Sequence, residues 1–228
     1  LLLQKVLVIQ PHFQIRYRKT ELALALDYQN KILDYHLLFK QEIEIEVLKK
    51  TDFQQLFLQK KINPLVKTHW TKFHHQPHFP SLYLHGGFGT GKTFFLQRII
   101  QSLIQNRKDF LFLKMIHLPR QIKEHLYDET IDKKMNLLFK IPYLFLDNLG
   151  AEAINSYLRD NVLFPLLDTR YEKGLHTFIS SNFNLAQLMQ HFMIGPGEKD
   201  KMRALRMIDR LKKMCQFYSF DHPRKELS

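Results

Sequence analysis

A glycine-rich stretch, GGFGTGKT at residues 86–93, constrains the fold of this chain more than any other feature. It fits the pattern G-x-x-x-x-G-K-[ST], with Gly91, Lys92 and Thr93 at its end. The preceding SLYLH reads as a buried strand, and the following FFLQRIIQSLIQ has apolar residues at helical spacing. Because a phosphate-binding loop needs a strand, a glycine loop and a helix in this order, the context indicates such a loop rather than a simple turn.

The chemistry of such a loop depends on its backbone. Glycines let N–H groups converge on phosphate oxygens, and the start of the next helix adds the positive end of its dipole. Lys92 is expected to reach the β- and γ-phosphates, and the Thr93 hydroxyl to bind Mg²⁺. The predicted nucleotide-binding residues are Gly86, Gly87, Phe88, Gly89, Thr90, Gly91, Lys92, Thr93 and Phe94.

Short apolar runs followed by helical patterns recur after residue 80. They lie at Leu82–Leu84, Phe110–Met115, Tyr143–Leu146 and Thr177–Ile179. Strands that alternate with helices indicate a parallel sheet with crossover helices on both faces. The sequence therefore predicts an α/β protein of three layers, with a boundary to its leading region near residues 70–80.

Polar residues follow two of these strands. Asp147 comes directly after YLFL, and the HTFISSN run ends in Ser180, Ser181 and Asn182. Open α/β sheets bind ligands at the carboxyl ends of their strands. Asp147 is therefore expected to hold the water shell of Mg²⁺. An amide at position 182 would orient the attacking water or touch the γ-phosphate.

The predicted helix EKDKMRALRMIDRLKKM has two distinct faces. Its arginines fall within an arc of about 60°: Arg203, Arg206 and Arg210. A separate apolar face consists of Leu205, Ile208, Leu211 and Cys215. The arginines are thus expected to point away from this helix's own core. They are either a solvated stripe or the source of an arginine finger for a neighbouring subunit.

The leading region has a different pattern. KVLVIQPHFQIRYRK reads as a hairpin, with Val6–Ile9 as one strand and the alternating residues 13–17 as the other. From residue 19 to about residue 50, helix formers predict one long helix or two in series, and residues 51–52 look like a further cap. The proline-containing loop HHQPHFP, residues 74–80, closes this region.

The charge of the chain indicates the class of its partner, and its cysteine content indicates the compartment. Lys and Arg total 34 against 22 Asp and Glu, a formal net charge of +12, which favours a polyanion such as nucleic acid. The single cysteine excludes an internal disulfide and suits a reducing, cytoplasmic compartment. No apolar run reaches the roughly 18 residues of a membrane span, and the opening LLLQKVLVI lacks the features of a signal peptide.

Four segments, taken together, resemble the AAA+ ATPases of the bacterial replicative helicase loader group, the DnaC/DnaI-like ATPases. They are LYLHGGFGTGKTFFL, PYLFLDNLGAE, YLRDNVLFPLLDTRYEKGLHTFISSNF and RALRMIDRLKKM, in this order. The resemblance implies an AAA+ core with parallel strand order 5-1-4-3-2 and no full lid. It implies an N-terminal hairpin and helical linker at residues 1–75, a P-loop ATPase domain at 76–222 and a tail at 223–228. The zinc-binding amino-terminal domain of that group has no counterpart in this sequence.

The same resemblance implies a function. A protein of this group binds the replicative DNA helicase and helps to place it on single-stranded DNA during primosome assembly, as a homo-oligomer when helicase-bound and with no role for a membrane. ATP and Mg²⁺ are the implied cofactors. Asp147 would serve Mg²⁺, Asn182 would be the sensor, and Arg210 would be the arginine finger, with Arg206 as the second choice.

Two positions depart from the pattern of that group. Relatives carry a second acid after the strand aspartate, where this chain has Asn148. An amide holds a water but cannot accept its proton, so ATP hydrolysis at this catalytic position is expected to be slow. Glu152 is a possible substitute for this missing acid, although it lies further along the sequence. Pro165 follows inside a predicted helix and is expected to kink it.

Other functional interpretations remain open. Asn148 favours a nucleotide-gated helicase adaptor that hydrolyses little ATP, and a transposition-helper ATPase would share the same core. A small-molecule kinase has little support, because no acceptor-binding insertion is visible. The histidines His74, His75 and His78 form a poor metal cage without a nearby carboxylate or cysteine. The aromatic residues Trp70, Phe73 and Phe79 fit packing better than base stacking.

Overall fold

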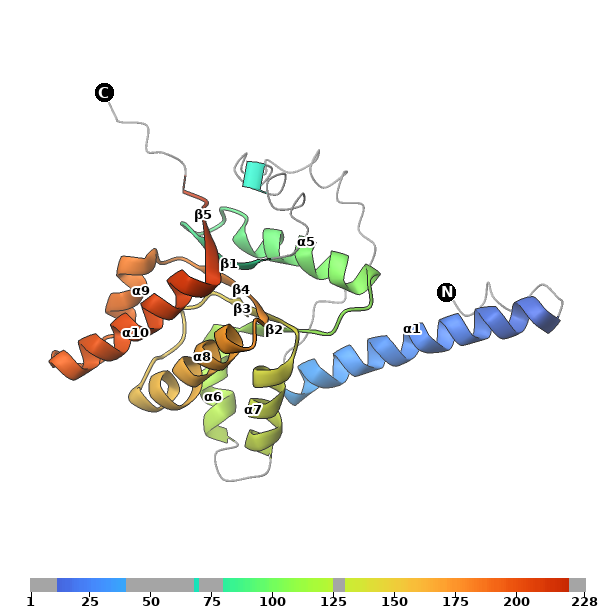
Figure 1. Cartoon of the computed structure of the whole chain (residues 1–228), viewed down its shortest axis with the longest axis horizontal. Helices are drawn as coiled ribbons and strands as arrows, with labels where there is room; N and C mark the ends of the chain where they lie inside the picture. Colours follow the sequence, from blue (N-terminus) through green and yellow to red (C-terminus); the bar gives the residue numbers. More distant parts are fainter. Residues whose placement is uncertain (1–11, 40–67, 70–79, 125–129, 222–228) are drawn as a thin grey trace.

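The computed structural model describes residues 12–39, 68–69, 80–124 and 130–221. Its centre is a parallel sheet of five strands in the order β2-β3-β4-β1-β5 (Figure 1). The strands are β1 (Ser81–His85), β2 (Phe110–Lys114), β3 (Tyr143–Asp147), β4 (His176–Ser181) and β5 (Cys215–Ser219). This order is 5-1-4-3-2 counted from the other edge, so the predicted fold class and strand order are confirmed.

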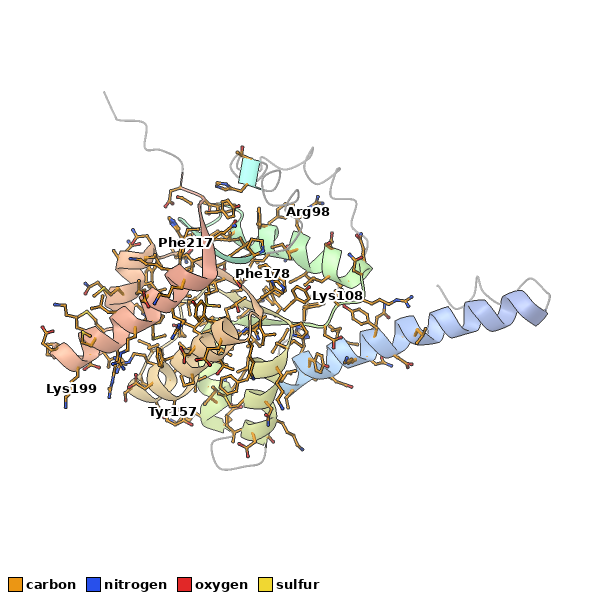
Figure 2. The ribbon with its side chains drawn as sticks, viewed as in Figure 1. Arg98, Lys108, Tyr157, Phe178, Lys199 and Phe217 are labelled. Carbon is orange, nitrogen blue, oxygen red and sulfur yellow. The ribbon has the colours of Figure 1, made fainter. Side chains whose placement is uncertain are left out.

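Successive side chains of each strand enter two different cores, one on each face of the sheet. In β1, Leu82 and Leu84 pack with α5, whereas Tyr83 belongs to the core on the opposite face. Phe178 lies in the middle of β4 (Figure 2), with its ring centroid 4.7 Å from that of Phe145. Because both faces are covered, the strands read as short continuous apolar runs rather than alternating ones.

Helices form the outer layers on both faces of the sheet (Figure 1). One face carries α5 (Lys92–Gln105) and the carboxyl-terminal part of α1. The other face carries η1 (Met115–His117), α6 (Leu118–Glu124), α7 (Thr130–Lys140), α8 (Phe164–Glu172), α9 (Leu185–Phe192) and α10 (Glu198–Met214). Within the described ranges, every helix is too short or too polar to span a lipid bilayer.

In the described part of the leading region, a helix takes the place of the second strand of the predicted hairpin. α1 spans His12–Leu38, so the alternating residues 13–17 are helical and their assignment to a strand is wrong. The first predicted strand lies outside the described residues, as do residues 40–67 and 70–79 with the predicted cap and domain boundary. The helix formers that follow residue 18 explain the difference, because extending an existing helix costs less than starting a new element.

One further expectation on helices needs correction, and another corresponds to a local irregularity. Cys215 does not lie on a helix: it is the first residue of β5, buried beside Ser81 of β1, although its placement in the core is confirmed. Pro165 lies inside a helical stretch that runs without a break from η2 (Leu158–Leu163), a π-helical segment, into α8. The regular α-helical pattern is therefore interrupted directly before Pro165, as expected where a proline removes one backbone N–H inside a helix.

His36 attaches α1 to β2, an edge strand of the sheet. Its Nε2 accepts a hydrogen bond of 3.0 Å from the Phe112 N–H, so Nδ1 carries the proton and donates to the Ile32 carbonyl oxygen at 2.7 Å. The Tyr28 hydroxyl donates to the carbonyl of Lys108, which lies beside α1 (Figure 2). The buried imidazole therefore satisfies a backbone N–H that the sheet leaves unpaired.

We expect this contact to make stability depend on pH. Burial lowers the pKa of His36 from 6.5 to about 4, and protonation would remove the acceptor for Phe112. The unfolded chain takes up this proton near pH 6.5. The contribution of neutral His36 to the free energy of unfolding is therefore complete above that pH and is lost as the pH falls to about 4. Between pH 7.5 and 5, wild type should lose about 2 kcal/mol of unfolding free energy that His36→Gln retains, measured by urea denaturation. Equal losses in both proteins would contradict the assignment.

Candidate nucleotide-binding site

The register of the sheet brings the predicted site residues together. β3 and β4 pair Leu146 with Ile179, so that Asp147 is level with Ser180. β4 and β1 pair Ser181 with His85, which places the start of the glycine loop next to residue 182. The carboxyl ends of three neighbouring strands therefore form one edge, where open α/β sheets bind ligands.

The glycine loop runs from β1 into α5 and turns sharply at its end. Gly91 has φ 99°, a left-handed conformation that favours glycine, and it is the residue from which α5 starts. The Thr90 hydroxyl donates to the Gly87 carbonyl at 2.9 Å and closes the loop on itself. The first amides of α5 thus lie at the loop, where a helix amino terminus stabilises phosphate. Phe88, at the apex, is 89% exposed, whereas Phe94 packs against the core on the α5 face.

Lys92 lies inside this loop and is buried. Its Nζ donates to the carbonyl oxygens of Gly86 and Gly87, each at 2.7 Å, and to Oδ1 of Asn182 at 2.9 Å. Burial lowers the pKa of Lys92, and the negative charges of Asp221 and Asp147 oppose that effect. A single ammonium group is therefore held between the phosphate loop and the end of β4, in reach of both predicted functional elements.

Asp147 accepts hydrogen bonds from hydroxyl groups on two elements. Its Oδ1 accepts hydrogen bonds from Thr93 Oγ1 at 2.9 Å and from Ser180 Oγ at 2.5 Å. The Ser180 hydroxyl also accepts from the Asn148 N–H at 2.9 Å, which ties β3 to β4 at this point. Asp147 is almost fully buried, so these bonds fix its carboxylate beside Thr93.

The pair of Thr93 and Asp147 fits a magnesium site shared with a nucleotide. A hydroxyl and a carboxylate are hard oxygen ligands, and Mg²⁺ commonly takes one or two such groups together with substrate phosphates and water. In the described part of the chain, no three His, Cys, Asp or Glu side chains gather as a metal cage of their own. The oxygen atoms of Thr93 and Asp147 are thus suited to an ion that arrives with phosphate.

Comparison with known proteins identifies the family. A family model described as IstB-like ATP binding protein matches residues 19–222. The chain belongs to the IstB-like ATP-binding protein family. The replicative helicase loader DnaI of Bacillus subtilis (strain 168) is 32% identical over 212 residues, which cover 91% of this chain and 67% of DnaI.

Solved structures agree with this membership. The crystal structure of DnaI is similar with a TM-score of 0.65 and 31% identity, covering 78% of this chain and 94% of that one. AMPPCP-bound DnaA from Aquifex aeolicus has a TM-score of 0.56 at 17% identity, over 73% of this chain and 49% of that one, and shows the fold alone. The protein is thus an AAA+ member of the IstB-like family.

In this IstB-like protein, the turn after β3 is built from backbone contacts and one buried acid. Asn148 has φ 61°, a left-handed conformation that asparagine and aspartate tolerate better than most residues. Glu152 accepts from the Gly150 N–H at 2.7 Å and pairs with His191 at 3.0 Å. These contacts hold Glu152 in the turn and against α9, so none of them supports its use as a substitute base.

Arg210 does not join the other predicted site residues. It forms an ion pair with Asp168 of α8, and its guanidinium lies 4.6 Å from the centroid of the Tyr171 ring. Arg203 pairs with Asp160 of η2 at 2.9 Å, and Arg206 is exposed. Two of the three arginines therefore contact the neighbouring helix of the same chain, which neither predicted interpretation included. Leu205 is 38% exposed, so its assignment to the apolar face is wrong.

Sequence reasoning left two contributors to the site without a role. Ser180 was visible only as one of several polar residues at a strand end, although its hydroxyl orients Asp147. Asp221 lies 134 residues beyond Gly87, and its carboxylate accepts that residue's N–H. Only the pairing of distant strands brings such groups together, so no local signal marks them. The histidines and aromatic residues considered at positions 70–79 lie outside the described residues.

Proposed function

We propose that this protein is an ATP-dependent helicase loader that binds the replicative DNA helicase and helps to deposit it on single-stranded DNA. The observation that carries the proposal is the 32% identity to replicative helicase loader DnaI across 91% of this chain. The clustering of Lys92, Asp147 and Asn182 at one edge of the sheet supports it, because a loader of this type needs a nucleotide site.

ATP and Mg²⁺ are the proposed ligands of this site. The loop amides and the Lys92 ammonium would bind the phosphates, and Thr93 with Asp147 would hold Mg²⁺, which neutralises phosphate charge when bound. Asn182, whose amide oxygen already contacts Lys92, would respond to the phosphate that Lys92 engages. The surplus of basic residues, +12 overall, supports contact with a nucleic-acid backbone.

Assembly is the third part of the proposal. Arg210 would serve as an arginine finger toward a neighbouring copy in a helicase-bound oligomer. Within one chain, Asp168 and Tyr171 hold its guanidinium on the surface of α8, at 24% side-chain exposure. Arg206, exposed on the same side of α10, is the alternative. To act as an arginine finger, the guanidinium of either residue would have to leave its present position and bind a phosphate.

Helicase capture followed by a loading assay tests the proposed function. The purified protein should retain the replicative helicase in a pull-down with ATP and should increase the amount of helicase bound to single-stranded DNA. Binding without any loading would favour the nucleotide-gated adaptor, which Asn148 supports. Failure to bind the helicase with ATP, with ADP or without nucleotide would reject both and favour the transposition-helper ATPase.

The residue after Asp147 gives a prediction for catalysis. Asn148→Asp should raise the steady-state rate of ATP hydrolysis at least tenfold, because a carboxylate can accept the proton of the attacking water and an amide cannot. Aspartate also tolerates the left-handed backbone at this position, so the turn should survive the change. Phosphate release assays at saturating ATP provide the measurement. Equal rates in the two proteins would reject the idea that Asn148 limits hydrolysis.

A further inference from the structure

The end of β5 continues along the phosphate loop. Phe220 donates its N–H to the His85 carbonyl at 2.7 Å, one residue beyond the last β1–β5 pair. Its buried ring meets Phe95 of α5 edge-on, with centroids 5.8 Å apart. These two contacts fix the backbone that leads to Asp221. A Cβ on Gly86, which has φ 145°, would lie 3.0 Å from the Asp221 nitrogen, so only glycine allows this approach.

Asp221 and Lys92 bind opposite ends of one peptide unit. The Gly87 N–H donates to Oδ1 of Asp221 at 2.8 Å, and the carbonyl oxygen of Gly86, in the same peptide group, accepts from Lys92 Nζ at 2.7 Å. The first peptide of the phosphate loop thus lies between a carboxylate and an ammonium. Hydrogen bonds to ionised groups are stronger than neutral ones, so both charges hold this peptide in place.

The charge of Asp221 also acts on Lys92 itself. Burial lowers the pKa of Lys92. Two negative charges oppose this effect, and that of Asp221 raises the pKa more than that of Asp147. Burial lowers the pKa of His85 most, the Asp221 charge raises it, and the Lys92 charge lowers it. Mg²⁺ would offset the charge of Asp147 in a nucleotide complex, whereas Asp221 contacts the loop through the Gly87 N–H. Its negative charge would therefore remain at the phosphate loop.

We propose that Asp221 sets the preference of the nucleotide site for phosphate charge, by disfavouring a triphosphate more than a diphosphate. This inference rests on the proposed nucleotide-binding function. Like charges repel in proportion to their number, so the carboxylate weakens the binding of the more highly charged nucleotide most. Asp221 is in this sense a specificity-determining residue supplied by the segment after β5.

Two substitutions separate the charge of Asp221 from its hydrogen bond. Asp221→Asn keeps an oxygen that can accept the Gly87 N–H but removes the charge, and Asp221→Ala removes both. Asp209→Asn is the matched control, because Asp209 is an exposed acid on α10 that pairs with Lys213. Calorimetric titration with Mg²⁺ and either ADP or a non-hydrolysable ATP analogue gives the two dissociation constants for each variant.

Both Asp221 variants should increase the preference for the triphosphate over the diphosphate by about fivefold at low ionic strength. The increase should shrink as sodium chloride is raised from 50 to 500 mM, because salt screens exposed charges. Asp209→Asn should leave the preference unchanged. The inference would be overturned if Asp221→Asn left the preference for triphosphate unchanged, or if Asp209→Asn changed it as much as Asp221→Asn. In either case, nucleotide binding by the wild-type protein would still support the proposed nucleotide site. Absence of nucleotide binding by wild type would instead reject the proposed function.

Discussion

Lys92→Ala should weaken the binding of ATP about a hundredfold or more. The substitution removes the ammonium group that now contacts Gly86, Gly87 and Asn182 and that would pair with the phosphates. Hydrogen bonds between charged groups contribute about 1.5–3 kcal/mol each, and about 2.8 kcal/mol corresponds to a hundredfold change in affinity. Calorimetric titration with Mg²⁺ and ATP measures the loss directly.

The control for this prediction is another lysine of the same chain. Lys199 is exposed near the start of α10, at the far end of that helix in Figure 2. Lys199→Ala changes the net charge by the same amount and should leave ATP affinity within about twofold of wild type. Thermal melting of Lys92→Ala should show that the protein still folds. An affinity for ATP within threefold of wild type in a folded Lys92→Ala protein would remove the basis of the proposed site.

Arg170→Ala should cost about 4 kcal/mol of unfolding free energy, the largest effect on stability that we expect from a single change. The Arg170 side chain is fully buried in α8. Its guanidinium donates to the carbonyl oxygens of Leu138, Ile141 and His176 at 2.6–2.9 Å and to Thr177 Oγ1 at 2.8 Å. Alanine would leave these acceptors unpaired and open a cavity between α7, α8 and β4.

The charge of Arg170 explains why few substitutions can replace it. Burial lowers the pKa of its guanidinium to about 9, so the group stays charged at neutral pH. No carboxylate in the described part of the chain pairs with it; backbone carbonyls at the end of α7 supply the negative ends of dipoles instead.

Urea denaturation of Arg170→Ala, Arg170→Lys and Arg206→Ala tests this account. Lysine keeps the charge but cannot span the same acceptors, so it should recover only part of the loss. Arg206 is exposed, and its replacement should change stability by less than about 0.5 kcal/mol. A loss below about 1 kcal/mol in Arg170→Ala would show that the buried network contributes little.

Local sequence patterns were sufficient where one short segment contains both the signal and its structural context. The phosphate loop is such a case: its glycines follow a strand, Lys92 and Thr93 begin the next helix, and the whole unit takes 25 residues, Ser81 to Gln105. The position of Asp147 at the end of β3 could be predicted for the same reason, because a short apolar run marks the strand. The hairpin assigned to residues 13–17 failed, because five alternating residues cannot distinguish a strand from the first turns of a long helix.

The sequence by itself determined the elements of the α/β core and the residues that are chemically able to bind a nucleotide. Only the tertiary structure decided that Ser180 orients Asp147, that Arg210 lies against Asp168, and that Asp221 reaches the phosphate loop. The physical reason is that strand and helix formation depend on neighbours within one or two turns, whereas these contacts depend on strand pairing and helix packing between segments far apart in the chain. Their partners are fixed by the order and register of the sheet, which no short stretch of sequence encodes.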